Sequence, residues 1–398
     1  MFLLVNSYFL QYDGKKTPLD ILKNTKETKL HLLQNYPNDL NISDDHNMLI
    51  FGENVSVLKT LQKTFEQKIS LVYIDPPFST NQIFKSGFDR TSTISHSNSD
   101  NVAYVDQLTG RNYFEFLRTC LIFLKELLSN LGSIYVHIDT KKGHYVKIIL
   151  DEIFGEIYFI NHISRIKSNP KNFKRSAYGN IHDMILFYSK SKNYVWNNSV
   201  EEYSKEDVIR LFNKIDENGN RYTTNPLHAP NETSKGETGK NWKHLSPPKG
   251  RHWRYSIKKL DELDENGLIE WSTNGNPRKI IYADDFIKKK KKRQDIWTFK
   301  DKPNPSYPTE KNLDMLQEIM CTSSNIDDYV LDCFSGGGST LLAAQLQGRK
   351  WIGIDKSPVA IETTIIKLLS QKNTKPFSLY VSEEYLTKLP QTLKKLIK

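Results

Sequence analysis

Short apolar runs alternate with amphipathic stretches over much of this chain. The clearest apolar runs are residues 48–51, 71–75, 134–139, 184–188, 329–332 and 351–355. They are short and rich in β-branched and aromatic residues, which is typical of buried strands. Residues 55–65, 112–131 and 341–347 instead have the pattern of helices. Strands that alternate with helices predict an α/β fold with a doubly wound sheet.

The pattern also divides the chain. Residues 1–45 have only a weak apolar face, supplied by Leu32, Leu33 and Leu40, and are predicted to form a helical preface. Residues 46–189 form the first half of the sheet domain. Between 190 and 299 the periodicity weakens, Gly, Pro and Asn increase, and aromatic residues lie among cations, which predicts a separate polar module. Residues 300–398 return to the strand and helix pattern and contain the second half of the domain and a C-terminal tail.

The run at 71–75 ends in Asp75, Pro76, Pro77 and Phe78. Neither proline can donate a ladder hydrogen bond, so the strand must end with Asp75 at its carboxyl edge. There the carboxylate and the Pro76 carbonyl can accept from an exocyclic amine while the Phe78 ring stacks on a planar base. A capped Pro-Pro turn is the equally weighted structural reading. The polar, aperiodic residues 79–110 that follow predict a mobile loop over the site.

A second strand end lies far downstream. Asp332 closes an apolar run and is followed by a turn that contains Gly336, Gly337 and Gly338, and the next run ends in Asp355. Asp355 comes 23 residues after Asp332, close to the roughly 20 expected when a second-strand acid binds a ribose. The turn lacks the G-x-G-x-x-G and P-loop patterns, which favours a nucleoside ligand without a pyrophosphate. Glu53 also follows a strand, where a ligand contact and a helix N-terminal acid are equally weighted.

The net charge of the chain indicates which class of partner it binds. Lys and Arg number 56 against 46 Asp and Glu, a net charge of +10, which favours a polyanion such as nucleic acid. The polar module holds Lys249, Arg251 and Arg254 among aromatic residues, and a lysine run. The lysine run comprises Lys288, Lys289, Lys290, Lys291, Lys292 and Arg293. We predict phosphate contacts from these cations, although such a run is most often a solvated face.

The remaining composition excludes other classes. The three cysteines show no metal-ligand or disulfide spacing, so no metal site is predicted. The apolar residues 1–10 lack a basic leader and are too short to span a membrane. We therefore expect a cytoplasmic protein without a membrane partner.

Together these motifs resemble the S-adenosylmethionine-dependent amino-methyltransferases of DNA. Asp75 to Phe78 match the D/N/S-P-P-Y/F motif, Phe334 to Gly338 are similar to the F-x-G-x-G motif, and residues 307–311 resemble Y-P-T-x-K. The motif order is that of the permuted β group, and the polar module is similar to segments of type III modification subunits. Cys333 in place of Pro and Phe78 in place of Tyr depart from the usual pattern.

The resemblance implies a Rossmann-like methyltransferase sheet, mostly parallel with one antiparallel strand, and an inserted target-recognition module. It implies catalysis by Asp75, Pro76, Pro77 and Phe78. The implied contacts to S-adenosylmethionine come from Glu53, Asp75, Thr309, Lys311, Asp332, Phe334, Ser335, Gly336, Gly338, Ser339 and Asp355.

The implied activity is methylation of the N6 amine of adenine in double-stranded DNA by base flipping, in a restriction-modification or orphan system. Cytosine N4 is an alternative, although family members acting on cytosine more often have Ser at position 75. The other alternative functions are a non-catalytic DNA-binding subunit and an RNA or protein amine methyltransferase. Carbon-5 methylation is excluded because no cysteine follows a proline. A restriction endonuclease subunit and a homodimer are possible partners by analogy.

Overall fold

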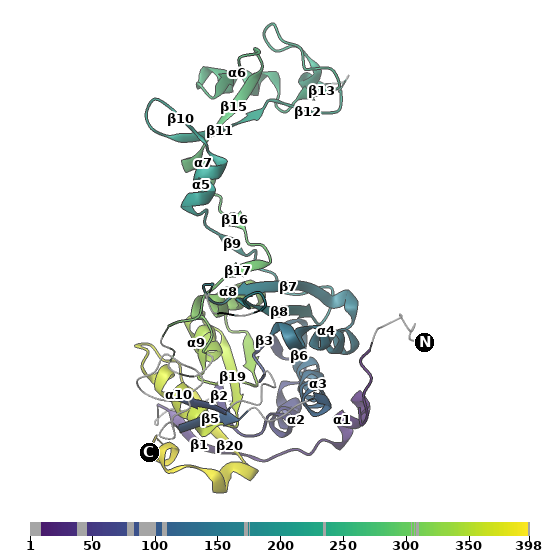
Figure 1. Ribbon diagram of the computed structural model, residues 1–398, viewed down its shortest axis with the longest axis vertical. Helices are drawn as coiled ribbons and strands as arrows, with labels where there is room; N and C mark the ends of the chain where they lie inside the picture. Colours follow the sequence, from purple (N-terminus) through teal and green to yellow (C-terminus); the bar gives the residue numbers. More distant parts are fainter. Residues whose placement is uncertain are drawn as a thin grey trace. The chain divides into compact units, whose positions relative to one another are not determined.

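Figure 1 shows the computed structural model, which describes residues 9–37, 46–77, 83–86, 101–105, 110–170, 174, 176–233, 236–303, 305, 307 and 310–396, with backbone alone at 83–86 and 101–105. The chain divides into two compact units. The sheet unit comprises Met1–Asn198 and Gln294–Lys398, and the inserted unit comprises Ser199–Arg293.

The sheet unit is built on a 10-stranded sheet with the order β1-β20-β2-β19-β18-β3-β6-β8-β7-β17. The strands are β1 (Leu30–Tyr36), β2 (Asn47–Phe51), β3 (Ile69–Ile74), β6 (Leu128–Ile138), β7 (Phe159–Ile166), β8 (His182–Ser189), β17 (Ile296–Thr298), β18 (Tyr329–Asp332), β19 (Lys350–Asp355) and β20 (Phe377–Ser382). The helices are α1 (Pro18–Asn24), α2 (Asn54–Phe65), α3 (Gly110–Leu127), α4 (Thr140–Phe154), α8 (Leu313–Ser323), α9 (Ser339–Leu346), α10 (Pro358–Leu369) and α11 (Gln391–Leu396).

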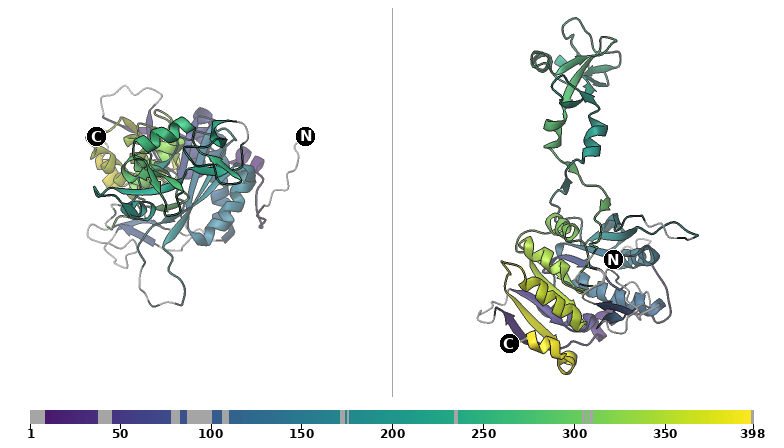
Figure 2. Two further views of the ribbon diagram at one scale, coloured as in Figure 1. Left: turned by 90° about the horizontal axis from the view of Figure 1, so that it is seen from above. Right: turned by 60° about the vertical axis from the view of Figure 1, so that its left-hand side comes forward.

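Both faces of the sheet are covered, which makes the predicted α/β layers (Figures 1 and 2). Successive strand residues alternate between two hydrophobic clusters, as the pleat requires. Val72 and Ile74 of β3 join the cluster of α2, α3 and α4, whereas Leu71 and Tyr73 join that of α8, α9 and α10. This two-sided burial explains why the central strands have continuous apolar runs.

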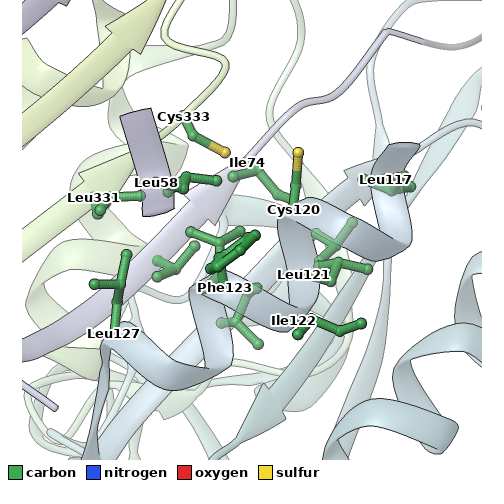
Figure 3. Close-up of a cluster of buried hydrophobic side chains, with 14 of the residues drawn as sticks. Leu58, Ile74, Leu117, Cys120, Leu121, Ile122, Phe123, Leu127, Leu331 and Cys333 are labelled. Atoms are coloured by element: carbon green, nitrogen blue, oxygen red, sulfur yellow. The ribbon is translucent and has the colours of Figure 1, made fainter. Parts of the chain in front are cut away.

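The first of these clusters fixes the ends of two strands. Figure 3 shows Cys120, Phe123 and other buried side chains of α3 in one cluster with Ile74 and Leu331. Ile74 and Leu331 immediately precede Asp75 and Asp332. The carboxylates therefore extend from strands whose last apolar residues are locked in the core.

The two halves of the predicted site meet at the centre of the sheet. β18 pairs with β3 in parallel, and β18 also pairs with β19. From β3 the chain continues to β6 on one side, and from β18 to β19 on the other, so the strand order reverses between them. This is the topological switch point, where open α/β sheets bind ligands at the carboxyl ends of strands.

The N-terminal preface is not wholly helical, so that prediction is wrong for Leu30–Tyr36. This segment forms β1, antiparallel to β20, and Leu32, expected on a helical face, is exposed. Pairing with the open edge of β20 satisfies backbone groups that local propensity ignores. The described sheet therefore has two antiparallel strands, β1 and β8, where one was expected. Leu40 lies outside the described residues.

Residues 79–110 were predicted as a loop without regular structure. Within them β4 (Ile83–Ser86) and β5 (Asn101–Val105) form an antiparallel pair, which corrects that expectation for these segments. Phe78 lies outside the described residues.

The inserted unit has a small core of Leu227, Trp242, Trp253, Leu260 and Leu263. Its elements are β9 (Val200–Glu201), α5 (Lys205–Leu211), β10 (Lys214–Ile215), β11 (Arg221–Pro226), β12 (His228–Pro230), β13 (Arg251–Trp253), α6 (Ile257–Glu265), β14 (Ile269–Trp271), β15 (Pro277–Tyr282), α7 (Ala283–Ile287) and β16 (Lys291–Lys292). The inserted unit spans fewer residues, 199–293, than the predicted module of residues 190–299. Asn197 is bonded to Thr322, and residues 296–298 form β17 beside β7, so both flanks belong to the sheet unit.

Candidate active site

Asp75 has one occupied and one unoccupied carboxylate oxygen. Its Oδ2 lies 2.7 Å from Nζ of Lys311, and the two side chains are only 16% and 11% exposed. Its Oδ1 is buried and has no hydrogen-bond partner among the described residues. A buried acceptor without a donor is costly, so it indicates a position for a ligand donor. Pro76 follows and is buried, and as a proline it has no backbone N–H to donate.

Asp332 shapes the adjoining turn. Its Oδ1 accepts from the Phe334 N–H at 2.9 Å, and the carboxyl is almost fully buried. Burial and, to a smaller extent, the charges of Asp75 and Asp355 raise the pKa of Asp332 to about 7, against the hydrogen bonds from Thr340 and Phe334. Asp332 was predicted as a cofactor contact, but its recorded partners are groups of its own turn.

Asp355 ends the next strand and holds the same turn from the other side. Its Oδ2 accepts from Gly336 N and its Oδ1 from Ser357 N, each at 2.8 Å. Burial raises the pKa of Asp355, while these backbone donors lower it. The Lys356 N–H donates to the same carboxylate, and the remaining lone-pair capacity of this carboxylate could accept from a hydroxyl group.

The glycine turn is packed against the chain's own side chains. Gly338 has φ +75°, and a Cβ there would lie 2.6 Å from the Thr364 side chain. A Cβ on Gly337 would lie 2.5 Å from Cβ of the buried Tyr307. The glycines are therefore required by internal packing, whereas the sequence had suggested close approach of a ligand. Ser335 likewise points inward, with its hydroxyl 3.2 Å from the Ile354 carbonyl.

Three further predicted contacts have structural partners. Glu53 is the N-cap of α2, with Oε2 accepting from Val55 N at 2.8 Å and from Ser56 N at 3.4 Å, as the helix-acid interpretation expected. Ser339 accepts from Lys367 Nζ at 3.1 Å. Phe334 lies edge-on to Phe116, with ring centroids 6.0 Å apart. Thr309 lies outside the described residues.

Sequence reasoning missed residues that support the site. Asn54 donates to the Cys333 carbonyl, which ties α2 to the cofactor turn. His137 lies inside an apolar strand, where the Tyr73 hydroxyl is 2.8 Å from its Nδ1 and Asp183 is 3.3 Å from its Nε2. Burial lowers the pKa of His137, and the charges of Lys311 and Asp75 also act on it. Only its polar character within an apolar run could have drawn notice.

In the inserted unit, the lysine run is paired internally. Lys291 lies 2.7 Å from Asp207 and 3.1 Å from Glu201, and Arg293 lies 2.8 Å from Glu201. Lys288 and Lys290 also have carboxylate neighbours, Asp285 and Glu202 respectively. These cations hold the β9–β16 pair and its surroundings, which is a structural role that the phosphate prediction did not foresee.

Lys249, Arg251 and Arg254 are exposed and lie on or beside the β12–β13 hairpin. Arg251 Nη1 lies 3.1 Å from His228 Nδ1, and Arg254 Nε donates to the His228 carbonyl at 3.1 Å. The pKa of His228 is lowered by burial and by Arg251, Arg254 and Arg278. Neutral His228 can therefore accept from Arg251 and orient both guanidinium groups.

Comparison with known proteins identifies the chain's family. Residues 69–367 match the family described as DNA methylase, N6_N4_Mtase. The chain belongs to this DNA methylase family. It is 39% identical over 362 residues to the type II methyltransferase M.EcaI of Enterobacter cloacae, covering 89% of this chain and 76% of that protein. The enzyme is thus a DNA methyltransferase related to those of restriction-modification systems.

More distant relatives are larger or share less sequence. The StyLTI Mod subunit of a type III restriction-modification enzyme from Salmonella typhimurium is 24% identical, and the match covers 75% of this chain but 49% of that subunit. The crystal structure of an M1.HpyAVI–SAM complex is 16% identical with a TM-score of 0.41, covering 81% of this chain and 100% of that one. In the part of the methyltransferase that the structure describes, no helix is long and apolar enough to cross a membrane.

Proposed function

We propose that this methyltransferase transfers a methyl group from S-adenosylmethionine to the exocyclic N6 amine of adenine in duplex DNA. The observation that carries the proposal is the buried, unpartnered Oδ1 of Asp75 at the switch point of the sheet. An amine hydrogen of the target base would donate to this oxygen, and a second could donate to the Pro76 carbonyl. Phe78 and Thr309, which lie outside the described residues, stay predicted contacts.

The residues around the glycine turn fit S-adenosylmethionine. Asp355 keeps acceptor capacity for ribose hydroxyls, and the turn that follows Asp332 is held rigid by hydrogen bonds on both sides. When bound, S-adenosylmethionine supplies a methyl group activated by a positively charged sulfur. Glu53 has a capping role on α2, and any contribution from it to the ligand is secondary in this proposal.

Asp75 activates the target amine in this proposal. The amine lone pair of adenine is delocalised into the ring, and hydrogen bonds to the Asp75 carboxylate and the Pro76 carbonyl favour a localised pair on nitrogen. As the new N–C bond forms, the bond between the methyl group and sulfur would break and leave the neutral thioether, S-adenosylhomocysteine. One amine proton is released, and Asp75 is placed to accept it and pass it to solvent. The base must leave the duplex stack to reach this buried corner.

The β12–β13 hairpin is the proposed DNA contact of the inserted unit. Lys249, Arg251 and Arg254 are exposed there, and His228 orients the two arginines without neutralising them. Arginine forks held in advance suit phosphate oxygens or the guanine edge. In the lysine run, Lys289 and Lys292 are exposed, but the paired members support a structural role. An endonuclease subunit and a homodimer stay predictions from the resemblance.

The experiment is nucleoside mass spectrometry of DNA incubated with the enzyme and isotopically labelled S-adenosylmethionine. The expected product is labelled N6-methyldeoxyadenosine. Labelled N4-methyldeoxycytidine would replace the adenine assignment with its cytosine alternative. DNA without label, under conditions where the cofactor binds, would overturn the catalytic proposal and favour a DNA-binding subunit.

A further inference from the structure

Two ion pairs lie back to back at the adjoining residues Glu310 and Lys311. Lys311 pairs with Asp75 at 2.7 Å, and Glu310 pairs with Lys367 at 3.1 Å. The side chains of the second pair are also largely buried, at 9% and 12% exposed. Lys367 further donates to Ser339 at the start of α9. The dipeptide therefore connects the Asp75 corner to the glycine turn.

The backbone that carries these residues is anchored at its C-terminal side. Asn312 caps α8 by accepting from Met315 N at 3.0 Å, and it donates to the Lys300 carbonyl at 2.9 Å. Glu310 N also donates to the Tyr307 carbonyl at 3.1 Å. Because α8 begins at Leu313, Lys311 has little freedom to leave Asp75 without disturbing the cap.

Lys311 determines which oxygen of Asp75 is open to a ligand. Its ammonium group lies 2.7 Å from Oδ2, and both side chains are largely buried. Oδ1 has no hydrogen-bond partner among the described residues. The contact with Lys311 therefore engages Oδ2 and leaves Oδ1 as the acceptor.

We propose that Lys311 is a positioning residue that holds Asp75 through its Oδ2 and so turns its Oδ1 toward the target amine. The resemblance implies a cofactor contact for Lys311, whereas the structure pairs it with the Asp75 carboxylate. This role rests on the proposed function of Asp75. It predicts that loss of Lys311 impairs methyl transfer through Asp75 and leaves the affinity for S-adenosylmethionine largely intact.

The test compares Lys311→Met, Lys311→Arg and the exposed control Lys300→Met with the wild type. Lys311→Met should lower kcat about 100-fold, the range of one lost electrostatic contact in an active site. Calorimetry should give a Kd for S-adenosylmethionine within about threefold of the wild type, which one weak contact would change little. Lys311→Arg keeps a cation that can reach Oδ2, so it should retain most of the wild-type kcat, and Lys300→Met should match the wild type throughout.

A double-mutant cycle separates positioning from an independent contact. In an Asp75→Asn background, adding Lys311→Met should change the residual rate less than about threefold, since the group it positions is gone. An equal 100-fold loss in both backgrounds, or a Kd that weakens as much as kcat falls, would overturn the role of Lys311. Inactivity of the wild type with every DNA would instead defeat the proposed function, so the two failures are distinguishable.

Discussion

The Asp75 corner and the lysine run are both dense in charge, yet they are organised in opposite ways. At the corner, Lys311 occupies one oxygen of Asp75, and the other oxygen is buried without a hydrogen-bond partner among the described residues. In the lysine run, Lys291 and Arg293 meet Glu201 and Asp207 in partly buried contacts. Charge density alone therefore does not identify a site. Other buried polar atoms of the described residues, such as the Ser133 hydroxyl, also lack a partner, so the informative feature is that the open Asp75 oxygen lies at the switch point of the sheet.

The largest expected stability effect concerns Asp332, which is buried beside Asp75. Its pKa is raised from 3.8 to about 7, so the stability associated with its protonated form is fully present below about pH 4 and is lost as pH rises through 7. Asp332→Asn should remove this dependence. Relative to the wild type, the variant should gain roughly 2–3 kcal/mol between pH 5 and pH 8.

Denaturant unfolding at both pH values measures this effect. If the free energies of unfolding of the wild type and of Asp332→Asn depended on pH in the same way, burial of the Asp332 carboxyl would carry no cost. The contrast between the two regions would then be lost.

Substitution of one glycine in each unit distinguishes the effect of side-chain packing from that of backbone strain on stability. Gly338 and Gly267 both have positive φ, +75° and +66°, but only Gly338 has side-chain atoms within 3 Å of an added Cβ. Gly338→Ala should destabilise the protein by about 2–3 kcal/mol, and Gly267→Ala by about 1 kcal/mol. Thermal melts give both values. Equal losses would mean that the turn is not constrained by Thr364.

The arginines of the β12–β13 hairpin should affect DNA binding more than catalysis. Replacing Arg251 and Arg254 by Ala should weaken DNA binding about tenfold at moderate salt and lower the salt slope by about 1–2. Fluorescence anisotropy over a salt series measures both. Lys243→Ala is the matched control, because Lys243 is already paired with Asp264. An equal effect of the control would remove the special role of the hairpin.

The smallest effect is expected in the lysine run. Lys291→Ala and Arg293→Ala should each cost about 1 kcal/mol, since their ion pairs are only partly screened from solvent, and should leave the DNA salt slope unchanged. The same anisotropy series provides the measurement. A slope lowered as much as by the arginine substitutions would restore the phosphate contacts that the sequence predicted.

Much of the site was predictable from the sequence because each acid ends an apolar run. Asp75, Asp332 and Asp355 were assigned to strand ends on that basis, and the structure places their strands side by side. The α/β class followed from the alternation of strands and helices. β1 was missed because its structure depends on pairing with β20, whose partner cannot be read from local spacing.

Long-range partners explain the remaining errors. Asn54 supports Cys333 across 279 positions of the chain, and Lys291 meets Asp207 across 84. Neither separation leaves a periodic signal. The resemblance pointed to Lys311 as a site residue, but only the structure shows that it pairs with Asp75. The sequence therefore predicted well which side chains lie close together. It predicted less well which of them already have a hydrogen-bond or ion-pair partner.

The central claim is that the unpartnered Oδ1 of Asp75 receives the target amine. Single-turnover methyl transfer by Asp75→Asn, with DNA and S-adenosylmethionine both saturating, tests it most directly because binding no longer limits the rate. The account predicts a rate at least about 1,000-fold below the wild type, in the range expected when a proton acceptor and an electrostatic contact are lost together, with cofactor affinity retained. A rate within a few-fold of the wild type would contradict it.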